Sequence, residues 1–231
     1  SKMTYMVLSI LMIFLVACFI ASRLLKAGIG AIFTKTMASL GMVFGAVLSL
    51  STGYAFFHLY IILGVICGML GDIFLELKRV YPENDFLYFN FGMTAFAVGH
   101  IMYLIAIIKM TGASNSLLVP ALISLAIAVA FASLLILVLA KPLKLEFGKC
   151  KWQSFAYCIL LTFLTAFSIF VYFKTTVSIL LPLGFVAFLL SDLVLSLQYF
   201  GGEGKIDEPL LVTVNHVLYY GAQVLLIGLL F

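Results

Sequence analysis

The stretch that decides the fold is YAFFHLYIILGVICGMLGDIFLE, residues 54–76, whose only acidic side chains stand near its end. A helix needs roughly 20 predominantly apolar residues to cross the hydrocarbon core of a bilayer, and this stretch is long enough. The composition agrees, because 65% of the 231 residues are hydrophobic and only 10% are charged. An ordinary soluble domain carries about 25% charged residues. With a mean hydropathy of +1.27, the sequence predicts an integral membrane protein.

Seven further stretches share this apolar character, so we expect an all-α membrane protein with eight transmembrane helices in a single domain, residues 1–231. The expected spans are about 4–22, 31–50, 54–76, 87–108, 116–140, 152–173, 175–199 and 209–230. Their short connections predict that consecutive helices are antiparallel neighbours. Nucleic-acid binding has no support, because the net charge is only +4 and the basic residues are scattered.

The distribution of lysine and arginine predicts the orientation. The side of the membrane that holds both termini carries Lys2, Lys109 and Lys174. The other side carries the larger group: Arg23, Lys26, Lys78, Arg79, Lys141, Lys144, Lys149, Lys151 and Lys205. The positive-inside rule makes this second side cytoplasmic. The membrane would be the plasma or inner membrane of a bacterium, or the endoplasmic reticulum of a eukaryote.

Two segments far apart in the chain have similar sequences. GMLGDIFLEL (68–77) ends the third span and FLLSDLVLSL (188–197) ends the seventh, and each contains small-Asp-x-x-Leu-x-Leu. Parallel repeats related by an axis along the membrane normal occur in membrane folds. The pair therefore predicts two parallel four-helix repeats with halves at residues 1–110 and 115–231. Chance similarity between two apolar helices is the alternative.

Several polar side chains fall inside the predicted spans. A charge in the hydrocarbon core costs at least about 2.5–3.5 kcal/mol, so such groups should face the bundle interior and one another. At about 1.5 Å per residue, most of them lie within roughly 6–12 Å of the cytoplasmic boundary. They are Lys35, Asp72, Glu76, His100, Asp192, Asn215 and His216. Their convergence predicts a shared polar cavity open to the cytoplasmic leaflet.

Most of these residues also have a structural interpretation. Lys35 could extend to the interface, and Glu76 stands near enough to the boundary to be solvated. Asp72 and Asp192 could form a buried pair that locks helices, although their short side chains reach water less easily. In the last span, Asn215, Tyr219 and Gln223 recur at i, i+4 and i+8 as one polar stripe. Hydrogen bonding between helices is the structural alternative for that stripe.

Two membrane carboxyl groups suggest acid–base chemistry. A carboxyl group in a low-dielectric cavity keeps its proton more readily than in water. Two such groups close together can supply one acid and one carboxylate. This pair suits acid-catalysed cleavage through an oxocarbenium ion, as in glycoside hydrolysis. No nucleophile elbow or HExxH pattern is present. The four cysteines form no CxxC pair, so we expect neither a metal ion nor another cofactor.

The order of the motifs along nearly the whole chain resembles the YhhN-like lysoplasmalogenases. The matching elements are Thr34-Lys35, Gly71-Asp72, FNFGMTAFAVGHIMYL (89–104) with Phe89, Gly92, Phe96, His100 and Tyr103, then Ser191-Asp192, and Tyr219-Tyr220-x-x-Gln223. One departure is Thr36, where the family pattern has proline. It concerns the start of the second span more than the chemistry.

The resemblance implies hydrolysis of the vinyl ether bond of lysoplasmalogens. The products would be a fatty aldehyde and glycerophospho-ethanolamine or glycerophospho-choline. Asp72 and Asp192 would be the catalytic residues, in an order left unassigned. The implied substrate-binding residues are Lys35, Glu76, His100, Tyr103, Asn215, Tyr219 and Gln223. The expected partners are a lysophospholipid substrate and the bilayer.

Two other functions use membrane carboxylates. A proton-coupled transporter would suit the repeat and the aspartates, although the spans lack a clear pair of matching Gly or Pro breaks. An intramembrane aspartyl protease would also have two aspartates. Here Gly68-x-x-Gly71-Asp72 lacks the tight GxGD spacing, and Pro120-Ala121-Leu122 precedes the second aspartate.

Overall fold

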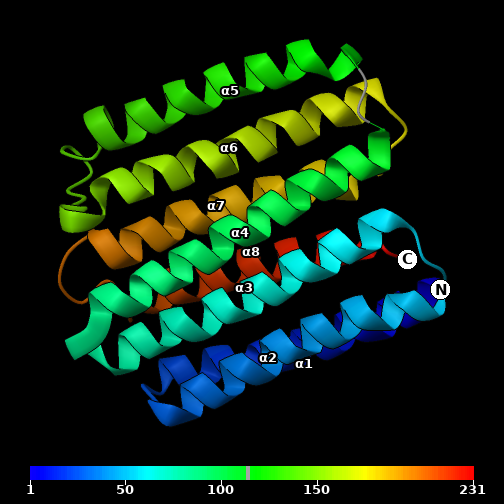
Figure 1. The fold of residues 1–231 in the computed structure, drawn as a ribbon. Coiled ribbons are helices and arrows are strands. Elements are labelled where there is room, and N and C mark those ends of the chain that lie inside the picture. The colour runs from blue at the N-terminus through cyan, green and yellow to red at the C-terminus, as the bar shows by residue number, and fades with distance from the viewer. Residues whose placement is uncertain (113–114) are drawn as a thin grey trace. The chain divides into compact units, whose positions relative to one another are not determined.

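The computed structural model describes residues 1–112 and 115–231, and these residues form helices and no strand (Figure 1). Within this part of the chain, eight helices are long and apolar enough to cross a membrane. This confirms the predicted all-α membrane class. The long helices are α1 (Lys2–Leu24), α2 (Ile29–Leu48), α3 (Phe56–Val80), α4 (Asp85–Thr111), α5 (Leu118–Ser133), α6 (Lys151–Lys174), α7 (Leu180–Phe200) and α8 (Pro209–Gly228).

Shorter helices extend or precede some of these spans. A π-helix, η4 (Leu134–Leu139), continues α5, so that this span runs over Leu118–Leu139. Single 3₁₀ turns are η1 (Ser49–Ser51), η2 (Pro82–Asn84), η3 (Asn115–Leu117) and η5 (Gly148–Cys150). The predicted boundaries agree to within a few residues, with the largest difference at α7, which begins at Leu180 instead of residue 175.

The chain forms two compact units. The first contains Ser1–Ala106 and Gln223–Phe231, and the second contains Ile107–Ala222. Helices α4 and α8 therefore each contribute residues to both units. The halves expected from the sequence repeat, 1–110 and 115–231, stay a prediction.

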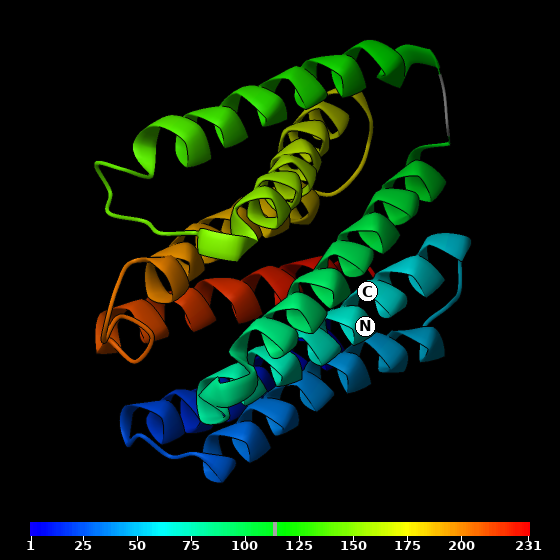
Figure 2. The same cartoon turned by 60° about the vertical axis from the view of Figure 1, so that its left-hand side comes forward.

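In the first unit, α2 packs against both α1 and α3, and the three helices run side by side (Figure 2). The buried face of α1 consists of Leu8, Met12, Val16, Phe19 and Arg23. The other face is also apolar: Ile10 is 61% exposed and Ile13 is 71% exposed. A helix that is apolar all round is typical of a membrane span, where lipid covers the outer face.

Glycines let α4 approach the backbone of α3 closely. A Cβ atom at Gly64 would lie 2.3 Å from the ring of Tyr103, and one at Gly71 would lie 2.6 Å from the ring of Phe96. Two aromatic rings of α4 therefore occupy the space that a side chain would need at these two glycine positions of α3. This contact fixes the rotation of α3 at Asp72, the residue after Gly71.

Polar contacts hold the end of the chain in the first unit. The Tyr5 hydroxyl donates to the carbonyl oxygen of Val224 at 2.7 Å. The Tyr103 hydroxyl donates to Oε1 of Gln223 at 2.5 Å. Nε2 of His58 lies 3.3 Å from the carbonyl oxygen of Leu230. These contacts explain why the last residues group with the first half of the chain.

The second unit packs α6 between α5 and α7. The Thr165 hydroxyl of α6 donates to its own helix and also to the carbonyl oxygen of Phe185 in α7, at 3.3 Å. Between η4 and α6 the chain turns back, and the backbone N–H of Glu146 donates to the carbonyl oxygen of Phe200 at 2.9 Å. This bond holds the α5–α6 connection against the end of α7.

Candidate active site

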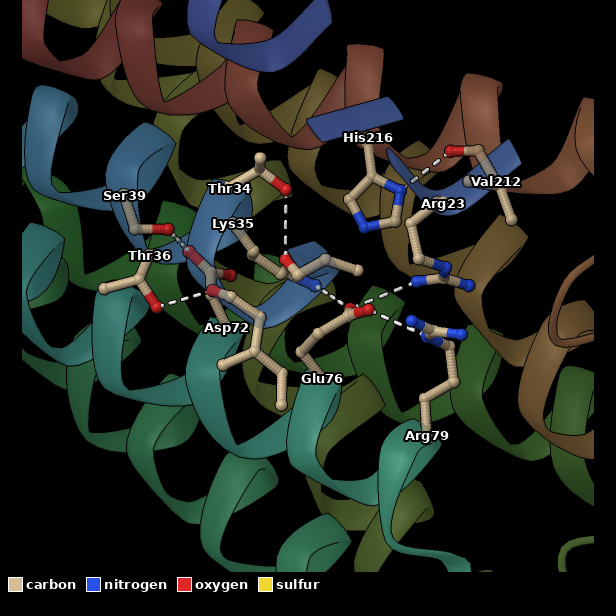
Figure 3. A network of polar contacts seen from close by, with 12 residues as sticks. Arg23, Thr34, Lys35, Thr36, Ser39, Asp72, Glu76, Arg79, Val212 and His216 are labelled. Atoms are coloured by element: carbon tan, nitrogen blue, oxygen red, sulfur yellow. Dashed lines mark hydrogen bonds and ion pairs between the residues drawn. The ribbon is translucent and has the colours of Figure 1, made fainter. Parts of the chain in front are cut away.

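The carboxylate of Glu76 in α3 forms ion pairs with three basic side chains in the first unit (Figure 3). Oε2 of Glu76 lies 3.1 Å from Nη1 of Arg23 and 3.4 Å from Nζ of Lys35. Oε1 of Glu76 lies 2.8 Å from Nε of Arg79, one turn further along α3. We call these four residues the Glu76 cluster. It joins α1, α2 and α3 by ion pairs.

The Glu76 cluster is enclosed by protein. Glu76 is 1% exposed, and Arg23 and Lys35 are each 4% exposed. Arg79 also donates to the carbonyl oxygen of Ala27 in the α1–α2 connection. Burial of ions is expensive unless each is paired with good geometry, and Glu76 provides that pairing for all three cations. The structural alternatives do not describe this arrangement. Glu76 is not solvated, and Lys35 does not extend to the interface.

Asp72 lies next to this cluster, one helical turn earlier on α3. The Ser39 hydroxyl of α2 donates to Oδ2 of Asp72 at 2.7 Å, and Asp72 is only 2% exposed. Ser39 itself stands one turn after Lys35. The contact between α2 and α3 therefore carries two polar layers, Lys35 with Glu76 and Ser39 with Asp72. A serine hydroxyl at this distance orients the carboxyl group.

Three residues of this site were missed by the sequence analysis: Arg23, Ser39 and Arg79 as partners of the acids. Helical periodicity carries the signal for each of them. Ser39 follows Lys35 at i+4, and Arg79 follows Glu76 at i+3, so each pair shares a helix face. Arg23 continues the buried stripe of α1. The count of basic residues by side treats both arginines as loop charges, whereas their side chains pair with Glu76 in the first unit.

His100, Tyr103 and Gln223 form a second polar group in the first unit. All three are buried, with exposures of 1% or less. Tyr103 donates to Gln223, as described above, and its ring centroid lies 6.3 Å from that of His100. The structure thus brings together three of the residues predicted to bind substrate. It pairs Gln223 with Tyr103 by a hydrogen bond between helices, which is the alternative considered for the α8 stripe.

The second aspartate, Asp192, lies in α7 in the second unit. Its Oδ2 accepts a hydrogen bond from the Tyr157 hydroxyl of α6 at 2.8 Å. One turn later, Ser196 donates its hydroxyl to the backbone carbonyl oxygen of Asp192 at 3.0 Å. Asp192 is half-buried. Tyr157 was not predicted; only its position on the helix preceding Asp192 could have suggested it.

Asn215 joins α7 to α8 in the second unit. Its Nδ2 donates to the carbonyl oxygen of Ser191 at 2.9 Å, and the Ser191 hydroxyl donates to the carbonyl oxygen of Asn215 at 3.1 Å. Tyr219 packs edge-on against Phe188, with ring centroids 5.4 Å apart. Nδ1 of His216 lies 2.7 Å from the Val212 carbonyl oxygen of its own helix. These hydrogen bonds between Asn215 and Ser191 therefore hold α8 against α7 at the residue before Asp192.

The predicted site residues thus fall into two groups. The first unit holds Lys35, Asp72, Glu76, His100, Tyr103 and Gln223, and the second holds Asp192, Asn215 and Tyr219. The meeting of Asp72 with Asp192 in one cavity stays a prediction. Among the described residues, no group of three or more His, Cys, Asp and Glu side chains could hold a metal ion.

These features define a polytopic α-helical membrane protein with carboxyl groups buried at helix–helix contacts. The chain belongs to the YhhN family, whose family model matches residues 30–230. The match begins just inside α2 and covers the remaining spans, so it confirms the resemblance drawn from the motifs. No curated protein and no solved structure matches the chain.

Proposed function

We propose that this protein is a lysoplasmalogenase, a hydrolase of the vinyl ether bond of lysoplasmenyl-ethanolamine or lysoplasmenyl-choline. The observation that carries the proposal is the Asp72 carboxyl group, which is 2% exposed within a membrane span and held by the Ser39 hydroxyl. Membership of the YhhN family supports a function of this type. A lipid substrate also suits an active site enclosed by membrane helices.

The chemistry needs one proton donor and one water molecule. A carboxylic acid protonates the outer carbon of the alkene, and the carbon attached to oxygen becomes an oxocarbenium ion. Water adds to that carbon and loses a proton to a carboxylate, which gives a hemiacetal. The hemiacetal collapses to a fatty aldehyde and the glycerol hydroxyl of the head-group product. A pair of carboxyl groups that exchanges these protons returns to its starting state.

Asp72 and Asp192 take the acid and water-orienting roles in this proposal, in an order left open. The role of Asp192 rests on the sequence, and its contact with Tyr157 supports it by fixing the carboxyl group. Ser39 is the positioning residue of Asp72. His100, Tyr103 and Gln223 would orient water or the glycerol hydroxyl, as would Asn215 and Tyr219.

The Glu76 cluster would serve the phosphate of the substrate. It contains three cations and one carboxylate, and the addition of Asp72 still leaves one positive charge in excess. Arg23 and Arg79 stand in the last turns of α1 and α3, and the ends of membrane spans are where phospholipid head groups would lie. Lys35 and the arginines would attract the phosphodiester, while Glu76 would hold them in place. The substrate would enter from the cytoplasmic leaflet.

The experiment that tests the function compares two single-chain lipids. Purified protein in nanodiscs is incubated with a lysoplasmalogen and with the analogue whose ether chain is saturated. We expect aldehyde from the first lipid and none from the second, because only the vinyl ether can be protonated to an oxocarbenium ion. Release of no aldehyde from either lipid would contradict the proposal.

Proton-coupled transport is the second candidate, and the Glu76 cluster favours it. Buried ion pairs among helices are also found along the proton and ion paths of transporters. A transporter would move its substrate across sealed vesicles without changing it covalently. Flux of intact lysoplasmalogen together with no aldehyde would therefore favour this alternative.

A further inference from the structure

A cavity lies in the second unit where the α5 span ends and α6 begins. Its volume is about 530 Å³. The wall toward the membrane span includes Ile136 and Leu137 of the π-helix, and the connection contributes Leu145 and Phe147. Ile136, Leu145 and Phe147 are buried and form one apolar cluster. The cavity thus has an apolar wall built on a fixed loop.

The rim of this cavity is basic. Lys141, Lys144 and Lys151 line it, and Glu146 is the acidic residue among its lining residues. The backbone brings the first two lysines together, because the N–H of Lys144 donates to the carbonyl oxygen of Lys141 at 3.0 Å. Lys144 has a φ of 57°, which is costly for a residue with a side chain. Both lysines are exposed, so the turn presents two ammonium groups beside the cavity.

The residues around the cavity are of the kinds found at the membrane interface. Trp152, the only tryptophan of the chain, follows the lining residue Lys151 and is 66% exposed. The Lys151 ammonium group lies 5.3 Å from the centroid of the indole ring. Exposed tryptophans next to lysines are typical of the membrane interface. On the other side of the lysines, Leu137 and Val138 are 51% and 60% exposed, as expected for side chains that face lipid tails.

We propose that this cavity binds an anionic phospholipid of the surrounding bilayer. The lipid phosphate would lie among Lys141, Lys144 and Lys151, and an acyl chain would run along Ile136 and Leu137. Basic pockets at the ends of membrane helices bind anionic head groups in this manner. The apolar wall distinguishes this site from one for a soluble anion, because free phosphate gains nothing from it. The site uses none of the aspartates and is independent of the proposed function.

Trp152 is an intrinsic probe of this site. The protein is placed in nanodiscs of phosphatidylcholine that contain a minor fraction of lipid with brominated acyl chains, which quench indole fluorescence on contact. One sample contains brominated phosphatidylglycerol, and the other contains the same fraction of brominated phosphatidylcholine. We expect stronger quenching by the anionic lipid, and the difference should shrink in high salt. Equal quenching by the two lipids would overturn the proposal without any variant.

A double variant tests the residues. Lys141→Gln with Lys144→Gln leaves Lys151 beside the indole and should lower the preference for phosphatidylglycerol about tenfold or more. The matched control is Lys26→Gln with Lys205→Gln, which removes the same charge from other connections and should keep the preference. An undiminished preference in the first variant, or an equal loss in the control, would contradict the site.

A soluble competitor distinguishes the lipid from a free anion. An excess of glycerol 3-phosphate is added to wild-type nanodiscs that contain brominated phosphatidylglycerol. Quenching that persists supports a bound lipid. Recovery of the fluorescence to the level with brominated phosphatidylcholine would show a site for a free phosphate group and overturn the proposal.

Discussion

The contact between α2 and α3 in the first unit and the contact between α6 and α7 in the second are built alike around an aspartate. Asp72 accepts from Ser39, which stands 33 residues earlier, at 2.7 Å. Asp192 accepts from Tyr157, which stands 35 residues earlier, at 2.8 Å. In both units the donor is a hydroxyl group on the preceding long helix. The motif similarity between residues 68–77 and 188–197 therefore extends to how each carboxyl group is held.

The two contacts differ one turn after the aspartate. Glu76 occupies this position in the first unit and binds three cations, whereas Ser196 occupies it in the second and donates to the Asp192 carbonyl oxygen. Both units therefore contain an aspartate that accepts a hydrogen bond from a hydroxyl group. The cluster of buried charges is found around the aspartate of the first unit. This difference fits the proposed function, in which both aspartates take part in the chemistry. The phosphate would be bound by the first unit alone.

The largest effect should come from removing either aspartate. Asp72→Asn or Asp192→Asn should lower aldehyde release about 10²–10⁴-fold, because each removes a group that transfers a proton. The rate is measured with purified protein whose helical content and monodispersity match the wild type. Asp85→Asn, at an exposed position in the first turn of α4, is the matched control and should leave the rate unchanged. Near-normal turnover in both aspartate variants would contradict the mechanism.

Glu76→Gln should have the largest effect on stability. It leaves three buried cations without their carboxylate, and the loss of one partner from a buried ion pair costs about 3–5 kcal/mol. Ser196→Ala at the corresponding position should cost well under this amount, because a helix already satisfies the carbonyl oxygen that Ser196 contacts. Unfolding in mixed detergent micelles measures both variants. Similar losses for the two would show that the Glu76 cluster adds no special stability.

The hydroxyl groups that hold the aspartates should have a smaller effect on catalysis. Hydrogen bonds to charged groups contribute about 1.5–3 kcal/mol, so Ser39→Ala and Tyr157→Phe should each lower kcat about tenfold or more. KM should change little, since neither residue is expected to touch the substrate. Ser51→Ala and Tyr54→Phe remove exposed hydroxyl groups and serve as controls. A loss confined to Ser39→Ala would break the equivalence of the two aspartates.

The smallest effect concerns the glycine that admits Tyr103. Gly64→Ala places a methyl group against the Tyr103 ring and should cost about 1–3 kcal/mol of stability through overpacking. Gly221→Ala in α8 meets nothing within 4 Å, and alanine is the better helix former, so it should be neutral or slightly stabilising. Unfolding of the two variants under the same conditions gives the comparison. Equal stabilities would contradict the close α3–α4 contact.

The spans and the buried acids could be predicted from the sequence, because hydropathy and the cost of charge in lipid act on each helix separately. The partners of the acids could not, since they depend on which helices are neighbours and how each is rotated. Arg23 shows this most clearly: it stands at a helix end, outside the residues matched by the family model, and reads as a loop charge. Only the packing of α1 on α2 turns it toward Glu76.

The end of α8 shows a second limit of sequence reasoning. Asn215, Tyr219 and Gln223 form one stripe by periodicity, yet Asn215 bonds to Ser191 in the second unit and Gln223 bonds to Tyr103 in the first. The periodicity predicts that these residues share one face of the helix. It does not predict that different helices pack against different parts of that face. Those partners follow from tertiary packing.

The most direct test of the central claim is vinyl ether hydrolysis in D₂O. Protonation by a carboxyl group that exchanges with solvent places one deuterium on carbon 2 of the released aldehyde, and mass spectrometry detects it. Unlabelled aldehyde incubated with the protein in D₂O controls for later exchange. We predict one deuterium in the aldehyde from the wild-type protein and, for the Asp72→Asn variant, aldehyde release lowered about 10²-fold or more. Aldehyde without deuterium, or undiminished labelled aldehyde from the variant, would contradict the account.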